Sequence, residues 1–407
     1  MRSTIFVAQI SRWRRTIALL LGLALTLTPV AARADAVIGT GTPASCQSAQ
    51  AATDLSNAVA AGGVISFNCG PDPVTIVANT NATDQAVVVN GGGLVTLDGD
   101  NLRQLFFIFG TGNVTLNDIT LIDGDASQGG ALYVDTQAQA TVNGSFITSN
   151  NASGDGGGVY NKGVLTINNT TLGSNIAGAA GGGIHNSGGT VTITDSYLIS
   201  NQAPTGGALY TLNGQATLLR SAVRSSVVSG FGGGIYVAGP TTITNVTFSN
   251  NRAARGGGLY TAANTTVLNA TFNENRADLG GAIYHQAATT SVKNTILTGS
   301  LDTAGVNTSL NCDGPTLTTQ GRNLISDNTC VPNPSSVGDL LATDAKLGGW
   351  FGSPLRGYIP AEDSPALDYA QDCPATDQRG YPRPLGAGCD VGAIERGALV
   401  FLPLTQR

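Results

Sequence analysis

The stretch GGGIHNSG, Gly181 to Gly188, decides the fold of this chain. It places three glycines before an aliphatic residue and His185, one of only two histidines. A glycine loop that presents a histidine would suit a catalytic base. The same pattern recurs with tyrosine in the histidine position, as GGALY at Gly129, GGGVY at Gly156, GGALY at Gly206, GGGIY at Gly232, GGGLY at Gly256 and GGAIY at Gly280. His185 therefore occupies one step of an aromatic repeat.

Two independent registers give the same repeat length. The aromatic position recurs every 24 to 27 residues, at Tyr133, Tyr160, His185, Tyr210, Tyr236, Tyr260 and Tyr284. A polar corner follows each short β-like run at similar spacing, at Asp118, Gly144, Asn169, Asp195, Arg220, Asn245, Asn269 and Asn294. A fixed period in this range is typical of a solenoid.

The residue pattern within each period indicates strands. Val, Thr and Ile alternate with polar residues, and no amphipathic helical run interrupts the repeats. Three short strands per coil, each paired with its equivalent in the next coil, predict an all-β, right-handed parallel β-helix of about 25 residues per coil. The expected inward aliphatic residues include Val159, Ile184, Leu209, Ile235, Leu259 and Ile283. An Asn nine or ten residues before most of the aromatics is expected to satisfy a corner.

The glycines of each repeat have two expected roles. Gly181 and its equivalents lie at a corner, where a positive φ favours glycine. Gly182 and its equivalents face inward, where we expect the backbone to lie too close to the core for a side chain. The next position, Gly183, is Ala in three of the repeats.

The chain divides into five expected segments. Residues 1–34 resemble a secretory signal, with basic residues, an apolar run and Ala32-Arg33-Ala34 as a cleavage site. An N-terminal cap (35–70) contains the one helix expected, Ala49 to Ala61. The β-helix repeats (71–310) are followed by irregular C-terminal coils and a cap (311–398) and by a tail (399–407). Both caps are expected to cover the open strand edges at the ends of the solenoid.

The cysteines favour disulfides over metal ligands. They form three sequence-local pairs, Cys46 with Cys69, Cys312 with Cys330, and Cys373 with Cys389. No C-x-x-C motif is present, and export would place the chain in an oxidising compartment.

Charge and export limit the expected partners. The net charge of −6 becomes more negative when the arginine-rich signal is removed, and no other apolar run is long enough to span a membrane. Nucleic acid is therefore excluded as an expected partner. A secreted or cell-surface location is expected, with surface polysaccharide or another cell-surface protein as partner, and the oligomeric state stays open.

The repeats resemble those of a known group of bacterial surface proteins. The GGA[I/L]-type motifs resemble the repeats of the polymorphic outer-membrane-protein group. NLISDNTC at Asn323, SPALD at Ser364, CPATDQRG at Cys373 and CDVGAIE at Cys389 resemble the C-terminal segment of choice-of-anchor Q proteins. The resemblance implies a pectin-lyase-like β-helix at the cell surface and supplies no catalytic residues.

Two clusters are candidate sites. Asp98, Asp100, Asp123 and Asp125 form two Asp-Gly-Asp motifs one period apart and are candidate Ca²⁺ ligands, although Asp-Gly is also ordinary turn chemistry, which we favour. Arg252, Arg255, Arg276 and Asp278, near Glu274, are candidate contacts for an acidic sugar. Ion pairs between coils explain the same charges more simply.

The sequence thus predicts a protein without catalytic residues and without a cofactor. We expect a non-catalytic scaffold with an adhesin-like role. A carbohydrate-binding module that uses the outward aromatic row is one alternative. A polysaccharide lyase or glycoside hydrolase is another, but it would need paired acids or Ca²⁺ ligands beside a basic residue.

Overall fold

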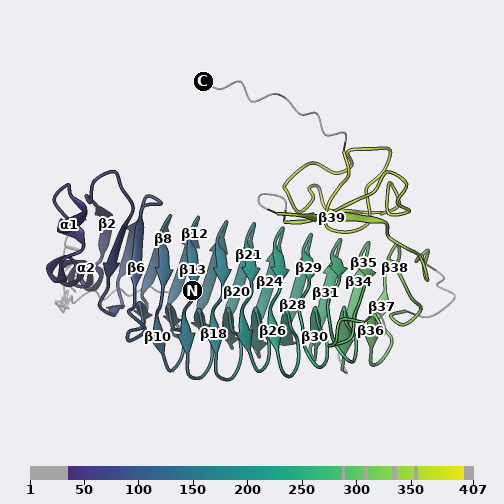
Figure 1. Ribbon diagram of the computed structural model, residues 1–407, viewed down its shortest axis with the longest axis horizontal. Helices are drawn as coiled ribbons and strands as arrows, with labels where there is room; N and C mark the ends of the chain where they lie inside the picture. The colour runs from purple at the N-terminus through teal and green to yellow at the C-terminus, as the bar shows by residue number, and fades with distance from the viewer. Residues whose placement is uncertain (1–34, 287–288, 307–309, 332–336, 353–355, 398–407) are drawn as a thin grey trace, which may run out of the picture. The chain divides into compact units, whose positions relative to one another are not determined.

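The computed structural model describes residues 35–286, 289–306, 310–331, 337–352 and 356–397. The predicted signal segment and the predicted tail lie outside these residues. In the described part each regular coil contains three main strands (Figure 1), and five of the coils add a fourth strand of two residues. The short strand lies in the Asn-bearing turn that the sequence pattern left without a strand.

Each strand stacks on its equivalent in neighbouring coils, which gives four parallel sheets in the described residues. Sheet A contains β1 (Ala36–Ile38), β2 (Gly63–Phe67), β5 (Ala86–Asn90), β8 (Asn113–Asn117), β12 (Gln139–Asn143), β16 (Val164–Asn168), β20 (Thr190–Thr194), β24 (Gln215–Leu219), β28 (Thr241–Thr244), β31 (Thr265–Leu268), β34 (Thr290–Lys293) and β37 (Thr318–Thr319). Sheet B contains β3 (Val74–Val77), β6 (Val95–Asp98), β9 (Thr120–Ile122), β13 (Phe146–Thr148), β17 (Thr171–Gly173), β21 (Tyr197–Ile199), β25 (Ala222–Arg224), β29 (Thr247–Ser249), β32 (Thr271–Asn273), β35 (Ile296–Thr298) and β38 (Leu324–Ile325).

The other two sheets complete each coil. Sheet C contains β4 (Asn81–Thr83), β7 (Phe106–Ile108), β11 (Leu132–Val134), β15 (Val159–Asn161), β19 (Ile184–Ser187), β23 (Leu209–Leu212), β27 (Ile235–Ala238), β30 (Leu259–Thr261), β33 (Ile283–His285) and β36 (Cys312–Asp313). Sheet D contains the short strands β10 (Asp125–Ala126), β14 (Asn151–Ala152), β18 (Ile176–Ala177), β22 (Gln202–Ala203) and β26 (Val227–Val228).

The register is the one that the repeat predicts. Val142 pairs with Ile167, and Ile167 pairs with Ile193, so equivalent residues stack from coil to coil. The predicted all-β parallel β-helix of about 25 residues per coil is confirmed.

Three left-handed residues bend each coil. The predicted polar corners between sheets A and B have positive φ, from 45° at Asn169 to 58° at Gly144. The glycine corners before sheet C have φ between 62° and 68°, as at Gly181. A third column, which the sequence analysis missed, follows sheet B and includes Ser149, Ser174, Ser200, Ser225 and Asn250.

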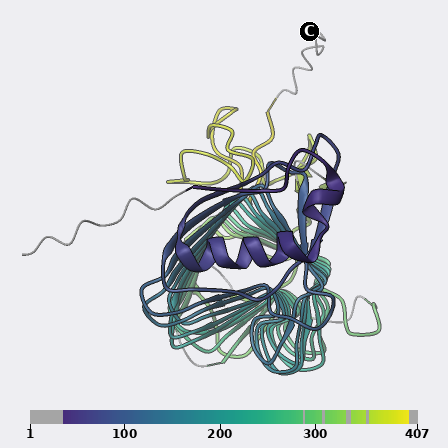
Figure 2. The same cartoon turned by 90° about the vertical axis from the view of Figure 1, so that its left-hand side faces the viewer.

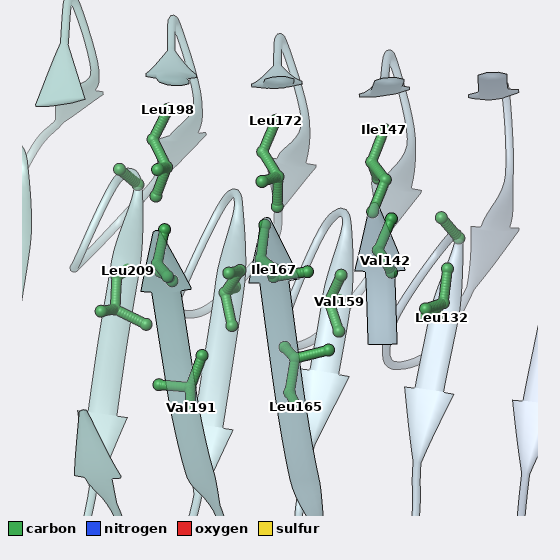
Figure 3. Close-up of a cluster of buried hydrophobic side chains, with 14 of the residues drawn as sticks. Leu132, Val142, Ile147, Val159, Leu165, Ile167, Leu172, Val191, Leu198 and Leu209 are labelled. Atoms are coloured by element: carbon green, nitrogen blue, oxygen red, sulfur yellow. The ribbon is translucent and has the colours of Figure 1, made fainter. Parts of the chain in front are cut away.

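Aliphatic side chains fill the interior of the coils (Figure 3). All six predicted inward residues, from Val159 to Ile283, have no exposed surface. Figure 3 shows Leu132, Val142 and Ile147 pointing into this interior from sheets C, A and B. Burying each such side chain contributes about 1.5–3 kcal/mol to folding. Because equivalent side chains recur, the contribution of one coil to the free energy of folding is similar to that of the next.

A buried Asn ladder runs beside the core. Asn150 Nδ2 donates to Asn175 Oδ1, and Asn175 Nδ2 donates to Asn201 Oδ1, both at 3.0 Å. Asn251 donates to Asn275 in the same way, whereas Ser226 interrupts the row between Asn201 and Asn251. These amides satisfy backbone groups in the turn, as the spacing predicts.

The reason for glycine at the Gly182 position differs from the prediction. A Cβ atom on Gly182 would lie 2.4 Å from Gln202 O and 2.6 Å from Gly207 O. The obstacle is therefore the backbone of the next coil and not the side chains of the core.

The N-terminal cap covers the first coil. Helix α1 (Pro43–Cys46) is followed by α2 (Ala49–Ala61), which lies across the end of the coils in Figure 2. Leu55 and Val59 on α2 are fully buried, Ser48 caps its N-terminus, and Gly62 ends it with a φ of 84°. The Cys46–Cys69 disulfide ties this helical segment to the chain that leaves β2.

The C-terminal segment covers a side of the solenoid as well as its end. The Cys312–Cys330 disulfide lies in the last coils. Residues 344–352 and 356–397, which we call the lateral cap, fold back over sheet B and carry the antiparallel pair β39 (Leu347–Phe351) and β40 (Gly357–Pro360) (Figure 1). The predicted irregular, disulfide-bearing cap is present, and its position over sheet B adds to the expected cover of the open end.

Specific hydrogen bonds attach the lateral cap to sheet B. Asn245 Nδ2 donates to Thr376 O at 2.7 Å, and Asn294 Nδ2 donates to Gln371 O at 2.8 Å. Thr247 Oγ1 donates to Gln378 Oε1 at 2.6 Å. Asn269 also donates to the backbone carbonyls of residues 390 and 392. The corner residues Asn245, Asn269 and Asn294 of three successive coils therefore form the turn and also bind the cap.

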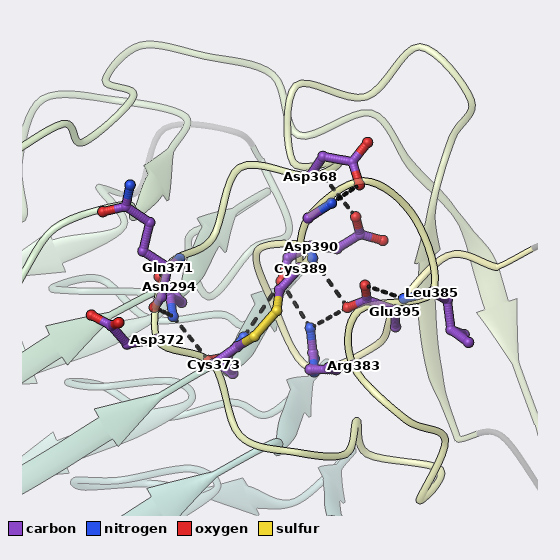
Figure 4. Close-up of a disulfide and its surroundings, with 12 residues drawn as sticks. Asn294, Asp368, Gln371, Asp372, Cys373, Arg383, Leu385, Cys389, Asp390 and Glu395 are labelled. Atoms are coloured by element: carbon purple, nitrogen blue, oxygen red, sulfur yellow. Dashed lines mark hydrogen bonds and ion pairs between the residues drawn. A yellow bond between two sulfur atoms is a disulfide. The ribbon is translucent and has the colours of Figure 1, made fainter.

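A buried ion pair organises the interior of the lateral cap (Figure 4). Arg383 Nη1 lies 2.7 Å from Glu395 Oε2, and both side chains are fully buried. Glu395 also accepts the backbone N–H groups of Leu385 and Asp390. The Cys373–Cys389 disulfide lies beside this network, so the cap is held by contacts that the repeats lack.

Candidate functional site

The outward aromatic row is a continuous stack. Neighbouring ring centroids lie 4.7–5.3 Å apart from Tyr133 to Tyr284. Phe107 extends the row by one coil, with its centroid 5.0 Å from that of Tyr133. Tyr160, His185 and Tyr260 are buried, so much of the row is unavailable as a platform for sugar rings.

His185 fills its place in this stack and is not presented as a base. Its ring lies between Tyr160 and Tyr210. Asp155 Oδ1 lies 3.1 Å from His185 Nδ1. Burial lowers the pKa of His185, and the nearby Asp155 carboxylate only partly opposes this effect. The imidazole is therefore neutral near pH 7, and its role is to pack as one aromatic ring of the stack.

His285 is also accounted for by packing. Its Nδ1 lies 3.0 Å from Thr261 Oγ1 and 2.9 Å from Thr290 Oγ1. Burial lowers the pKa of His285. Its hydrogen bonds join neighbouring coils and leave no arrangement typical of general acid–base catalysis.

The two Asp-Gly-Asp motifs lie in neighbouring coils but are offset by one residue, because Asp98 pairs with Ile122. Asp98 Oδ1 accepts the backbone N–H of Asp100 at 2.7 Å, while Asp125 Oδ2 accepts from Asn151 Nδ2 at 2.9 Å. Burial raises the pKa of Asp123, and the charge of Asp98 raises it further. In the described residues no three His, Cys, Asp or Glu side chains converge as a metal site. Turn formation thus accounts for the contact of Asp98, whereas Asp125 lies in β10 and is bonded to Asn151 of the next coil.

The predicted arginine cluster is divided between two places. Arg252 and Asp278 line one groove, and Arg276 lies beside Arg252 in the neighbouring coil. Arg255 instead stacks on the rings of Phe231 and Tyr284, at 5.7 and 5.5 Å from their centroids. The expectation of ion pairs between these charges is wrong. None of the ion pairs among the described residues includes one of these arginines or Asp278.

Glu274 lies apart from this cluster. Its carboxylate accepts from Tyr358 Oη and from Asn250 Nδ2, both at 3.3 Å. These contacts direct Glu274 toward the lateral cap, on a different side of the coil from Arg252. The sequence neighbours Glu274 and Arg276 therefore serve separate surfaces.

The groove over sheet D is the candidate binding site that best fits the predicted residues. Its volume is about 600 Å³, and Ile176, Val227, Gln202, Arg252 and Asp278 contribute to its lining. Ile176 and Val227 are 46% and 42% exposed, so the groove offers apolar surface to a ligand. Thr303 donates to Asp278 at 2.5 Å and fixes the carboxylate at its edge.

A second cleft lies between the lateral cap and sheet B. It has a volume of about 270 Å³ and is lined by residues that include Arg224, Glu274, Asp344, Trp350 and Tyr358. The guanidinium of Arg224 lies 4.1 Å from the Trp350 ring centroid. No local sequence pattern indicates this cleft, because its two walls come from segments that are at least 46 residues apart in the chain, as Thr298 and Asp344 are.

A third cavity lies within the lateral cap. Its volume is about 700 Å³, and Asp390, Arg379, Arg396 and Phe351 are among its lining residues. Burial raises the pKa of Asp390 to about 6, against the effect of backbone N–H donors at Arg396 and Asp368. The same groups build the buried network around Glu395, which accounts for their placement.

The fold and the repeats define the class of protein as a parallel β-helix repeat protein. Residues 245–262 and 269–286 match the family model for the Chlamydia polymorphic membrane protein (Chlamydia_PMP) repeat. No curated protein and no solved structure matches the chain. The matched residues span the glycine corners and aromatic positions of two successive coils, so the likeness rests on the repeat itself. Among the residues described here, no helix has the length and apolar character needed to cross a membrane.

Proposed function

We propose that this protein is a non-catalytic β-helix scaffold of the cell surface, secreted and adhesin-like. The observation that carries the proposal is the role of the repeated residues. The glycines, aromatic residues and asparagines that recur in each coil all have contacts within the stack. The match of two coils to polymorphic membrane protein repeats supports a surface location.

Labelling of intact cells tests this proposal. An antibody against the lateral cap should stain intact cells of the producing organism, and external protease should remove the signal. Beads coated with the purified chain should bind those cells or their hosts more than beads coated with a denatured sample. Staining that appears only after permeabilisation would contradict the surface location.

A carbohydrate-binding function is the second candidate, and the groove over sheet D favours it. The groove combines apolar surface with Arg252, Gln202 and Asp278, which suits a polar chain molecule. A glycan array should show a ligand that the Arg252→Ala variant loses. Arg322→Ala is the matched control, because Arg322 stacks on Tyr369 away from the groove. Equal binding by both variants would exclude this groove.

An enzymatic function, as a polysaccharide lyase or glycoside hydrolase, can be tested in the same preparation. The purified chain should release neither reducing sugar nor unsaturated product from pectin, alginate or glycosaminoglycans. Turnover that disappears in Asp123→Asn or Arg276→Ala would overturn the non-catalytic proposal and identify the site.

A further inference from the structure

A single column of threonines runs along the outer face of sheet A. The strand register pairs these side chains from coil to coil, at Thr115, Thr141, Thr166, Thr192, Thr217, Thr242 and Thr266. The first four are partly exposed and the last three are exposed. Val88 precedes the column and Ser291 follows it in the same register. We call this surface the threonine face.

The hydroxyls of this column are not used by the fold. None of the seven makes a hydrogen bond within the described residues. Threonines that face inward or lie at corners do have partners, as Thr170 and Thr295 show by donating to backbone carbonyls. A strand residue needs only a β-branched side chain, so Val or Ile would serve equally well for pairing. The hydroxyls are therefore available to solvent or to a ligand.

The threonine face is uncharged and contains no aromatic ring. From β5 to β31, the strands of sheet A contain no Asp, Glu, Lys, Arg, Phe, Tyr or Trp. Lys293, at the end of β34, is the first charge along this sheet after β5. In an acidic chain this distribution leaves no complementarity to a charged polymer. The rings on which sugars commonly stack are also absent from these strands.

The column repeats at a fixed spacing along the solenoid. Neighbouring threonines lie about 4.8 Å apart along the solenoid, and outward residues within a strand lie about 6.6 Å apart. In the first coils the adjacent column is held by hydrogen bonds, since Asn117 donates to Asn90, Asn143 to Asn117 and Asn168 to Asn143, at 2.8–3.0 Å. Thr194, Leu219, Thr244 and Leu268 continue that column. Ice presents water oxygens in a lattice whose short repeat is close to this coil spacing.

A shallow hollow on the same face offers room for ordered water. It has a volume of about 460 Å³, and its lining includes Thr217, Thr242, Thr266, Gln215 and Asn264. Side-chain hydroxyls and amides in such a hollow hold water through hydrogen bonds, while threonine methyl groups limit its disorder.

We propose that the threonine face binds the surface of ice crystals. An uncharged array with a fixed short repeat matches a neutral crystalline lattice better than a flexible or charged chain. Water ordered on the hydroxyls and methyl groups would continue into the crystal and anchor the protein there. This activity goes beyond the proposed scaffold function and uses a different surface from the groove over sheet D.

Ice partitioning of the full chain tests the proposal. The wild type should concentrate in slowly growing ice and inhibit ice recrystallisation. Thr166→Tyr and Thr192→Tyr should lose both effects, because a bulky ring disrupts the array while remaining compatible with a strand. Thr171→Tyr is the matched control, since Thr171 lies on sheet B in the same coil as Thr166 and should keep both effects.

Three results would overturn the proposal. The first is exclusion of the wild type from ice, with recrystallisation at the rate of a control protein. The second is an equal loss in Thr171→Tyr when all variants have the same melting temperature. The third is binding to microcrystalline cellulose or chitin, lost in Thr192→Tyr, without any effect on ice, which would assign the face to a neutral polysaccharide. Surface labelling of cells is independent of these outcomes, so failure here leaves the scaffold proposal standing.

Discussion

The solenoid and the lateral cap reach stability by different routes. In the solenoid one set of contacts recurs in each coil, as the stacked tyrosines and the Asn150–Asn175–Asn201 ladder show. In the lateral cap most contacts occur once, and the buried Arg383–Glu395 pair is central to them. Removal of one contact in a coil therefore leaves the equivalent contacts of the other coils in place. Removal of one contact in the cap destabilises the whole cap. The following predictions test this difference.

The largest effect is expected at the buried ion pair. Glu395→Ala would leave Arg383 buried without its partner, which costs about 3–5 kcal/mol in comparable proteins. The cap should become sensitive to limited proteolysis while the far-ultraviolet circular dichroism of the solenoid remains. Lys346→Met removes an exposed pair with Asp363 and should leave the protease pattern unchanged. A protease-resistant cap in Glu395→Ala would refute the central role of this pair.

The second effect concerns close approach between coils. Gly182→Val places a side chain against the backbone of the next coil and should cost about 1–3 kcal/mol or more, seen as a lower melting temperature. Gly349→Ala in the lateral cap is the control, because no atom lies within 4 Å of the added Cβ and its φ is not positive. If both variants melt like the wild type, the close packing of coils described here is wrong.

The Asn ladder should give a smaller effect of predictable sign. Asn175→Ala leaves buried backbone groups without partners and should cost about 1–3 kcal/mol. Ser226→Asn restores the amide where the row is interrupted and should raise stability by about 0.5–1.5 kcal/mol. Chemical denaturation of both variants measures the two changes. A stabilising Asn175→Ala would show that the ladder is not a source of stability.

The smallest effect is the pH dependence from His185. Its lowered pKa means that the unfolded chain binds the proton more readily, so its contribution is complete above about pH 6.5 and declines as the pH falls below that value. His185→Tyr should keep the stack and reduce the loss of melting temperature on acidification, although His285 retains its own part. An unchanged pH dependence would indicate that the ring environment of His185 has been misassigned.

The repeat explains what could be predicted from sequence and what could not. Glycine and aromatic spacing predicted the corners, the stack and the inward residues, because each feature recurs in every coil. The serine corners, such as Ser174 and Ser200, were missed because serine does not favour positive φ as Asn or Gly does. Their position is set by the coil geometry around them.

The type of residue at the polar corners weakly indicates which coils the lateral cap covers. Asp118, Asn169 and Asp195 are exposed, whereas Asn245, Asn269 and Asn294 are buried beneath the cap. The change from mixed corners to three successive asparagines marks the coils that the cap covers. Contacts such as Thr247 with Gln378 join residues 131 positions apart and leave no local pattern, so the cap clefts could not be predicted.

Deletion of one whole coil tests the central claim most directly, namely that each period is a structural unit of a parallel β-helix. Removal of residues 156–180 joins the chain from one glycine corner to the next and keeps every strand in register. The shortened protein should remain soluble and monodisperse, with the same circular dichroism per residue as the wild type. Removal of residues 156–167 breaks the register and should cause misfolding. If the whole-coil deletion misfolds as the partial deletion does, the account of the repeat as an independent structural unit is contradicted.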